Sequence, residues 1–194
     1  MADEALLIVD VQNDFCPGGA LAVEQGDSVV PVLNEYVEKL RIPVYASRDW
    51  HPVKTEHFKE FGGRWPPHCI RETNGAAFHP DLKLPANTIV VTKGTHPTDD
   101  GYSAFEGVAA DGRALAYVLR SNGIRKLYLG GLTTDYCVRS SALDALGEGF
   151  EVVLLTDAIQ GINVKPGDAA RAIEQVIRAG ASTATLETVK TDGA

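Results

Sequence analysis

The stretch that decides the fold is KLYLGGLTTDYCV, which spans residues 126–138. Its first seven residues form an apolar run that predicts a β-strand, and residues 135–146 carry apolar side chains at helical spacing. A strand that leads directly into a helix is a building unit of α/β proteins. Cys137 falls in the first turn of the expected helix, where the partial positive charge of a helix N-terminus lowers the pKa of a thiol. We therefore expect a nucleophilic thiol at this turn.

The rest of the chain repeats this alternation of strands and helices. Five further apolar runs predict strands, at residues 5–11, 42–47, 88–92, 151–156 and 184–188. Most of the runs are near-continuous rather than alternating, which is typical of strands covered on both faces. Further helical patterns lie at residues 28–41, 111–122 and 166–179. We predict one α/β domain, residues 1–194, with a doubly wound, mostly parallel six-stranded sheet and helices on both faces.

Residues 50–85 interrupt this alternation. The segment has weak hydrophobic periodicity and contains five prolines and three glycines. Loops longer than about 12–15 residues in a compact domain are usually functional or disordered. We expect a loop-rich excursion over the active-site face of the sheet, and not a second domain.

The composition restricts the partners of the protein. The chain has 194 residues, enough for one domain with a sizeable core, and its net charge of −8 argues against a nucleic-acid partner. No apolar stretch approaches the roughly 18 residues of a membrane helix, and the acidic first residues lack the basic flank of a signal peptide. Three cysteines without metal-finger spacing do not suggest a disulfide framework. We expect a cytoplasmic protein without a membrane partner, and the sequence leaves a homo-oligomer open.

Reactive side chains follow the expected strands at their carboxyl ends. Asp10 ends the first run, and Lys93 follows the run at residues 88–92. Parallel sheets bind ligands outside these ends, so both side chains are expected to meet Cys137 there. Singly, the aspartate could cap a loop amide, the lysine could be a solvated charge and the cysteine could pack in the core. Together they favour chemistry, because a lysine lowers the pKa of a nearby thiol and an aspartate can accept its proton.

A second group of polar residues has the chemistry of a metal site. Asp49 and His51 are two positions apart and lie on the same side of an extended segment. The two prolines directly before His68 make the backbone stiff and extended there, and His68 supplies another imidazole. One carboxylate with two or three imidazoles suits zinc, iron or manganese, with water completing the coordination. His57 is either a further ligand or an exposed loop residue.

The glycine pair Gly130-Gly131 and the tight turn after it allow backbone amides to point inward. Two such amides could bind an oxyanion next to Cys137. Cys16 and Cys69 lack a setting of this kind, and we expect them to pack as small hydrophobic residues in the core.

Short motifs along nearly the whole chain, in matching order, resemble known hydrolases. DVQNDF at residues 10–15, Lys93, and GLTTDYCV at residues 131–138 together resemble the isochorismatase-like cysteine hydrolases. SRDWHP at residues 47–52, WPPHC at residues 65–69 and YSAF at residues 102–105 narrow the resemblance to the nicotinamidases, also called pyrazinamidases.

The resemblance implies a role for each group of residues. The implied catalytic triad is Asp10, Lys93 and Cys137. The implied ligands of a divalent metal are Asp49, His51 and His68, with waters completing the shell. Some members of the family add a fourth protein ligand, a place that His57 could fill here. The metal, expected to be zinc with iron or manganese as alternatives, holds the pyridine nitrogen of the substrate and does not activate the attacking group.

The resemblance also implies how the substrate is bound. In this family a cis peptide, here Leu132–Thr133, precedes the nucleophile turn, and the amides of Thr133 and Cys137 are implied to bind the oxyanion. The implied substrate is an aromatic amide between apolar walls. The implied wall residues are Phe15, Leu21, Trp65, Tyr102 and Tyr136, of which at least one is expected to serve ordinary packing alone.

The function that this resemblance predicts is deamidation of nicotinamide to nicotinate and ammonia through a cysteine thioester, a step of NAD salvage. Pyrazinamide is a second expected substrate. The first alternative is a hydrolase of another small amide or carbamoyl compound. The second is a non-catalytic metal-binding or redox-sensing thiol protein, and a Cys–His dyad is the mechanistic alternative to the triad.

Overall fold

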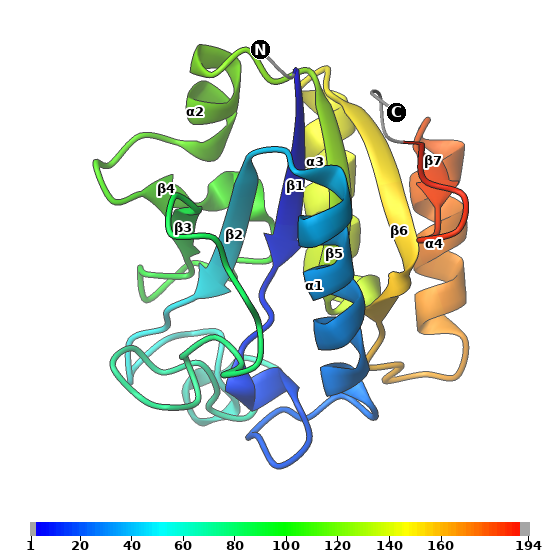
Figure 1. Cartoon of the computed structure of the whole chain (residues 1–194). Coiled ribbons are helices and arrows are strands. Elements are labelled where there is room, and N and C mark those ends of the chain that lie inside the picture. Colours follow the sequence, from blue (N-terminus) through cyan, green and yellow to red (C-terminus); the bar gives the residue numbers. More distant parts are fainter. Residues whose placement is uncertain (1–2, 191–194) are drawn as a thin grey trace.

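The computed structural model describes residues 3–190. Their centre is a seven-stranded sheet with the strand order β4-β3-β2-β1-β5-β6-β7 (Figure 1). The strands are β1 Glu4–Val9, β2 Val44–Asp49, β3 Ile89–Lys93, β4 Val108–Ala109, β5 Lys126–Leu132, β6 Glu151–Gln160 and β7 Ser182–Ala184. Neighbouring strands pair in parallel except β3 and β4, which are antiparallel. The chain winds outward from β1 in both directions, so the predicted doubly wound α/β sheet is confirmed.

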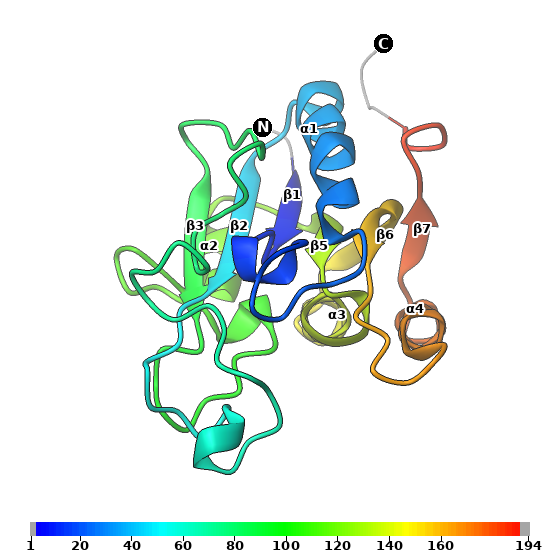
Figure 2. The same cartoon turned by 90° about the horizontal axis from the view of Figure 1, so that it is seen from below.

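Helices cover both faces of the sheet. The α-helices of the described residues are α1 Val29–Leu40, α2 Leu115–Ser121, α3 Arg139–Gly147 and α4 Asp168–Arg178. α1 packs on one face and the other three on the opposite face, as Figure 2 shows for α1 against α3 and α4. On β1, Leu7 and Val9 join one hydrophobic cluster and Leu6 and Ile8 the other, all fully buried. Burial on both faces explains why the strands are near-continuous apolar runs.

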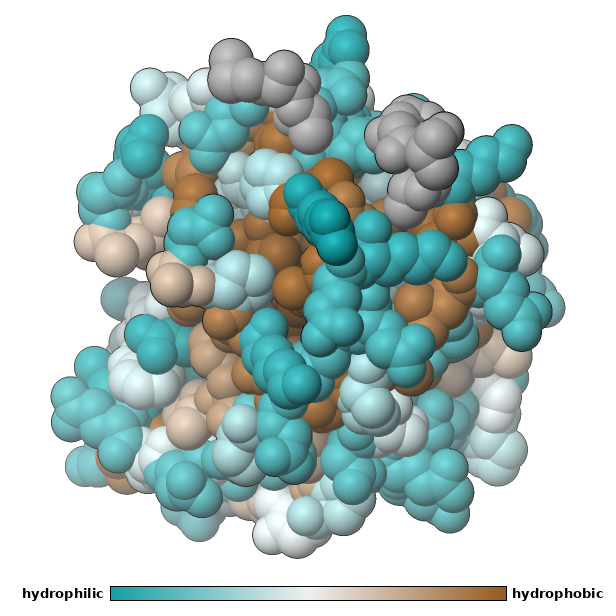
Figure 3. Space-filling model, viewed as in Figure 1, coloured by the Kyte–Doolittle hydropathy of each residue, from teal (hydrophilic) through white to brown (hydrophobic). Residues whose placement is uncertain are grey.

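The face that carries α1 is mostly hydrophilic, with hydrophobic residues showing in patches between the polar ones (Figure 3). α1 buries Leu33 and Tyr36 against the sheet and exposes Glu35 and Glu38. This division matches the helical spacing from which the helix was predicted. Within residues 3–190, none of the helices has the length and apolar character that crossing a bilayer requires.

Several boundaries differ from the sequence predictions. The sheet has a seventh strand, β4, whose two residues pair with β3 and are too few to form a recognisable apolar run. The strand predicted at residues 184–188 is wrong, because β7 ends at residue 184 and the chain then leaves the sheet in a hydrogen-bonded turn. β2 extends to Asp49, so this residue lies in the strand. The helix predicted at residues 135–146 divides into a π-helical turn, Thr134–Val138, and α3.

Most of residues 50–85 lie at the carboxyl ends of β1 and β2, at the lower edge of the sheet in Figure 1, before the chain returns to the start of β3. Their short 3-10 helix spans Lys59–Phe61. Isolated bridges hold the segment, at His51–Ile70, Phe58–Trp65 and Gln12–Phe78. The Gln12 side chain also donates to the carbonyl oxygens of Asp49 and Ala76, at 2.8 Å each. The segment is therefore hydrogen-bonded directly to the strand ends.

Candidate active site

Asp10, Lys93 and Cys137 meet at the carboxyl ends of three strands. Asp10 directly follows β1, Lys93 is the last residue of β3, and Cys137 lies in the π-helical turn after β5. The Lys93 Nζ is 2.7 Å from Asp10 Oδ2 and 3.7 Å from Cys137 Sγ. All three residues are buried. The structure thus brings together the three side chains that we expected at one edge of the sheet.

A close approach of β1 and β5 positions the thiol beside the aspartate. Val9 and Gly131 are paired in the ladder, so the residues that follow each strand lie side by side. Gly131 has a φ of +121°, and a Cβ there would lie 2.1 Å from the Val9 carbonyl oxygen. Only glycine allows two backbones to approach this closely. The glycine pair before the nucleophile turn therefore also has a packing role.

Hydrogen bonds tie the lysine to further acceptors. Lys93 Nζ is 2.5 Å from Asp49 Oδ1 and 2.5 Å from the Gly101 carbonyl oxygen. The Ser47 hydroxyl donates to Asp10 Oδ1 at 2.7 Å. The buried ammonium lies between two buried carboxylates, so the charges compensate one another in a setting where an isolated charge would be costly.

Burial dominates the electrostatics of this cluster. It raises the pKa of Asp10 to about 6, although the Lys93 charge opposes the shift. Burial also raises the pKa of the Cys137 thiol well above its usual range, again against the effect of Lys93. For Lys93, burial would lower the pKa, but Asp10 and Asp49 outweigh it and hold the pKa well above its usual range. The expectation of a lowered thiol pKa at Cys137 is therefore wrong, because the desolvation of a buried thiolate exceeds what the nearby positive charge provides.

Three buried imidazoles form a second cluster. One ring nitrogen each of His51, His57 and His68 lies within 4.8 Å of the others. His57 Nδ1 is 2.9 Å from Asp100 Oδ1, and His68 Nδ1 is 2.8 Å from the Pro66 carbonyl oxygen. In both rings Nε2 is the nitrogen left for another partner. His57 is buried, so the alternative of an exposed loop residue is wrong.

His51 provides the test of whether these residues fit a metal. Neither ring nitrogen of this fully buried imidazole has a hydrogen-bond partner within residues 3–190. A buried polar atom without a partner costs about 1–3 kcal/mol. The His51 Nε2 is 3.7 Å from Asp49 Oδ2, so a cation between the carboxylate and the imidazoles would satisfy both. The donor set of one carboxylate and up to three imidazoles fits zinc and related divalent metals.

The ionisation of the same residues also suits a metal. Burial lowers the pKa of His68 to about 4, which keeps the ring in the neutral form that binds metals. For Asp49, burial would raise the pKa, but Lys93 and His51 outweigh it and hold the pKa well below its usual range. At neutral pH the cluster therefore presents a carboxylate and a neutral imidazole.

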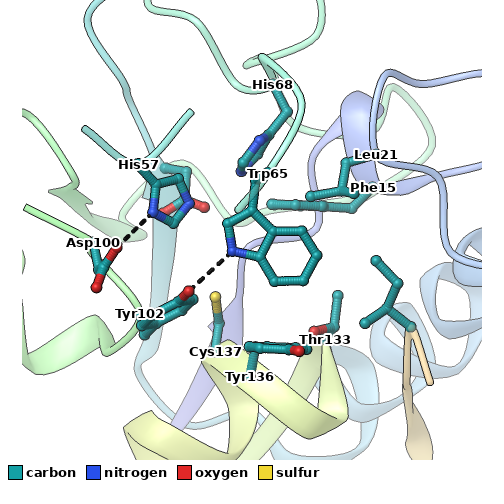
Figure 4. A pocket seen from close by; sticks show the side chains of 12 residues that line it. Phe15, Leu21, His57, Trp65, His68, Asp100, Tyr102, Thr133, Tyr136 and Cys137 are labelled. Carbon is teal, nitrogen blue, oxygen red and sulfur yellow. Dashed lines mark hydrogen bonds and ion pairs between the residues drawn. The ribbon is translucent and has the colours of Figure 1, made fainter. Parts of the chain in front are cut away.

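One pocket opens onto both the thiol and the imidazoles (Figure 4). Its walls are aromatic: the Trp65 Nε1 donates to the Tyr102 hydroxyl at 2.9 Å, and the Trp65 ring meets Tyr136 edge-on with centroids 4.8 Å apart. The lining residues are Phe15, Leu21, Asp49, His57, Trp65, His68, Asp100, Tyr102, Thr133, Tyr136, Cys137 and Ile162. All five residues expected to form the substrate walls are among them.

The turn that carries Cys137 begins after a cis peptide bond between Leu132 and Thr133. The amides of Tyr136 and Val138 both donate to the Thr133 carbonyl oxygen, at 3.1 Å each. Thr133 lines the pocket, and its Oγ1 is buried without a hydrogen-bond partner among the described residues. The cis bond is in the place that the resemblance implied.

Comparison with known proteins gives this geometry a family. A family model of the isochorismatase domain matches residues 4–188. The chain belongs to the isochorismatase family. The nicotinamidase of Escherichia coli is 40% identical over 205 residues, which cover 96% of each chain. The solved pyrazinamidase of Pyrococcus horikoshii in complex with zinc is 45% identical, with a TM-score of 0.87 over 95% of this chain and 100% of its own. A solved L. infantum protein in complex with nicotinate is 32% identical, with a TM-score of 0.89 over 99% and 98% of the two chains.

In this isochorismatase-family chain, the candidate site residues divide into two layers. Some of the candidate residues line the pocket itself, whereas Asp10, His51 and Lys93 lie behind it. Lys93 contacts Asp10 and the pocket residues Cys137 and Asp49, and His51 contacts Asp49. The structure places all of them in one site, and their individual roles stay predictions.

The pocket also contains residues that sequence reasoning missed. Asp100 comes from the polar stretch between Lys93 and the motif at residues 102–105, and Ile162 follows β6. Neither belongs to a motif with a recognisable spacing. The capping box at the 3-10 helix Ala104–Glu106 is a local signal that helps to fix the segment after Asp100.

Proposed function

We propose that this isochorismatase-family chain is a metal-dependent amidohydrolase that deamidates nicotinamide to nicotinate and ammonia. The observation that carries the proposal is one aromatic-walled pocket that opens onto a buried Asp–Lys–Cys cluster and a histidine cluster. A nucleophile can attack the carboxamide from one side while the ring nitrogen is held from the other. Pyrazinamide, an aromatic amide with a similarly placed ring nitrogen, is expected to be a substrate as well.

The first half-reaction forms a thioester. Asp10 takes the proton of Cys137 as the sulfur attacks the carboxamide carbon, because a thiol with a raised pKa needs a base at the moment of attack. The amides of Thr133 and Cys137 bind the oxyanion that develops. Asp10 then gives the proton to the leaving nitrogen, which departs as ammonia and leaves the acyl group on sulfur.

The second half-reaction restores the enzyme. Asp10, again ionised, takes a proton from a water that attacks the thioester carbon. The carbon–sulfur bond breaks, the sulfur regains a proton and nicotinate leaves. The Lys93 charge stabilises the carboxylate and the developing thiolate throughout, because its Nζ contacts both partners. Among the described residues, the side chain that hydrogen-bonds to the Cys137 thiol is the Lys93 ammonium and not an imidazole, so we prefer the triad to a Cys–His dyad.

The residues that would hold the metal are Asp49, His51 and His68, with His57 as a fourth protein ligand. We infer zinc, with iron or manganese as alternatives. When bound, the metal supplies a coordination position for a ring nitrogen of the substrate. Asp100 and the Pro66 carbonyl orient two of the imidazoles through their Nδ1 atoms. Hydrogen bonds of this kind fix the ring orientation and the tautomer that binds a metal.

The aromatic side chains hold the ring of the substrate in register with the thiol. Trp65 is fixed by its bond to Tyr102 and by the edge contact with Tyr136. Phe15 and Leu21 line the opposite part of the pocket in Figure 4. Such walls position a flat ring and exclude water from the reacting carbon.

The test is ammonia release from nicotinamide by metal-loaded and metal-stripped protein, with Cys137→Ala as the control. We expect turnover that is lost on chelation, restored by added metal and abolished in the variant. Mass spectrometry should detect an acyl group on Cys137 during turnover. Activity on nicotinamide that ignores chelation would favour the hydrolysis of other amides or carbamoyl compounds. A protein that releases no ammonia and forms no acyl-enzyme would favour a metal-binding or redox-sensing thiol protein.

We also infer the cellular setting. Cys16, Cys69 and Cys137 are all free and buried, which fits a reducing compartment such as the cytoplasm. Removal of the amide nitrogen converts nicotinamide to nicotinate, and this conversion suits a step of NAD salvage. The substrate is a small molecule, and a homo-oligomer would be tested by light scattering of the purified protein.

A further inference from the structure

A second hollow, of about 290 Å³, lies outside the catalytic pocket, between the π-helical turn and the start of α4. Four cationic side chains line it, and Tyr136 and Val164 add apolar surface. The cations are Arg64, Arg139, Lys165 and Arg171. We call this site the basic hollow. It is notable in a chain whose net charge is −8.

The two acidic residues of the basic hollow are already engaged. Asp135 accepts hydrogen bonds from the amides of Ile162 and Asn163, at 3.0 and 2.7 Å. Asp168 pairs with Arg171 at 2.6 Å and accepts the Lys165 amide at 2.8 Å. With four cations and these two carboxylates, the hollow keeps a surplus of two positive charges.

Among the described residues, three of the four cations lack a carboxylate partner. Within residues 3–190, no carboxylate oxygen lies at ion-pair distance from Arg64, Arg139 or Lys165. Arg139 is half-buried, whereas the other two are exposed. Like charges gathered around one cavity repel one another and favour a bound anion. Guanidinium groups bind phosphate oxygens in a paired geometry that suits such an anion.

The basic hollow shares a wall with the catalytic pocket. Tyr136 lines both cavities. The Arg64 guanidinium carbon lies 5.2 Å from the centroid of the Trp65 ring and 5.7 Å from that of Tyr136. Arg64 therefore joins the two cavities, because the guanidinium that would bind the anion also lies over two aromatic walls of the catalytic pocket.

We propose that the basic hollow binds the phosphoryl group of a small phosphomonoester. Such a group carries about −1.5 to −2 charges at neutral pH. It therefore balances the charge of three unpaired cations better than a carboxylate ligand, which carries one negative charge. The hollow is larger than one phosphate group, and Tyr136 and the half-exposed Val164 give the organic part apolar surface. The proposal rests on this cavity alone and does not depend on the reaction at Cys137.

The test is calorimetric titration of the metal-loaded protein with phenyl phosphate and with inorganic phosphate at constant ionic strength. We expect one site per chain and tighter binding of phenyl phosphate. Lys165→Gln, an exposed change, and Arg139→Gln should each weaken binding about two- to fivefold, the effect of losing one solvent-accessible ion pair. The matched control is Arg178→Gln, which removes one positive charge at the last residue of α4, outside the hollow, and should leave binding unchanged.

Four results would overturn the proposal. Absence of binding would remove the site. If Lys165→Gln and Arg139→Gln bind as tightly as the wild type, the phosphate binds elsewhere, for example on the metal. If Arg178→Gln loses as much affinity as these variants, the effect is one of net charge and not of the hollow. Equal affinity for the two ligands would show that the hollow takes a bare anion and not a monoester. Melting curves of each variant establish that the fold is intact.

Discussion

The Lys93 Nζ lies 2.7 Å from Asp10 Oδ2, and both side chains are fully buried. The same ammonium is 2.5 Å from Asp49 Oδ1. Asp10 belongs to the proposed catalytic group and Asp49 to the proposed metal site. One buried cation therefore joins the two halves of the site.

Removing this cation should cost both stability and activity. In Lys93→Met, two buried carboxylates lose their counterion, and breaking a buried pair in this way costs about 3–5 kcal/mol. We expect a loss of unfolding free energy of that order in urea titrations, together with loss of nicotinamide hydrolysis.

Lys126→Met is the matched control for this variant. Lys126 pairs with Glu4 at 2.9 Å on a partly exposed part of β5, where an ion pair contributes about 1 kcal/mol or less. Equal losses in the two variants would contradict the view that burial makes the Lys93 pairs different.

The activity should depend on the ionisation of Asp10. Its pKa is raised to about 6 by burial, and the proposed mechanism needs the carboxylate as a base. We expect kcat/KM to fall about tenfold for each pH unit below about 6. The pKa of His68 is about 4, so protonation of this proposed ligand comes later in the titration. A profile that stays flat down to about pH 5 would exclude Asp10 as the base.

The same shift has a consequence for stability. Because the folded pKa of Asp10 lies above the unfolded value of about 4, the folded state binds the extra proton between about pH 4 and 6. The contribution of this residue to the free energy of unfolding is fully present below that window and is lost as the pH rises through about 6. Relative to the wild type, Asp10→Asn should therefore gain stability with rising pH across this window. A constant difference in urea titrations would contradict the raised pKa.

Asp100 should control metal affinity through His57. Its Oδ1 is 2.9 Å from His57 Nδ1, although its side chain is 66% exposed. Loss of such a partner typically lowers metal affinity about 10–100-fold, so we expect this effect in Asp100→Asn. Competition with a chelator measures it independently of turnover. Asp99→Asn, a neighbouring exposed residue, is the control. Unchanged affinity in Asp100→Asn would argue against His57 as a ligand.

The sequence predicted the sheet well because its central strands are buried on both faces and are therefore continuous apolar runs. β1 and β5 were found at nearly their full length. β4 was missed because two residues paired at a sheet edge leave no periodic signal. The strand end at residue 184 is set by tertiary pairing with β6, which local composition does not encode.

The candidate site was predictable where its residues follow strand ends or form motifs. Asp10, Lys93 and Cys137 are of this kind. The pKa direction at Cys137 was not predictable, because it depends on how completely the folded chain buries the thiol. The contact of Asp100 with His57 joins two loops 43 positions apart, and no spacing rule relates them.

Gly94 should be essential for the metal site, because it makes room for His51. It has a φ of +64°, and a Cβ there would lie 2.5 Å from His51 Cε1. Gly94→Ala must therefore displace the imidazole as well as adopt an unfavourable backbone angle. The control is Gly62→Ala, which has a φ of +100° but no atom within 4 Å of the added Cβ. Both variants should lose about 1–2 kcal/mol of unfolding free energy from the backbone angle. Only Gly94→Ala should also lose bound metal, measured by elemental analysis after dialysis, and full metal content in that variant would mean that His51 is not a ligand.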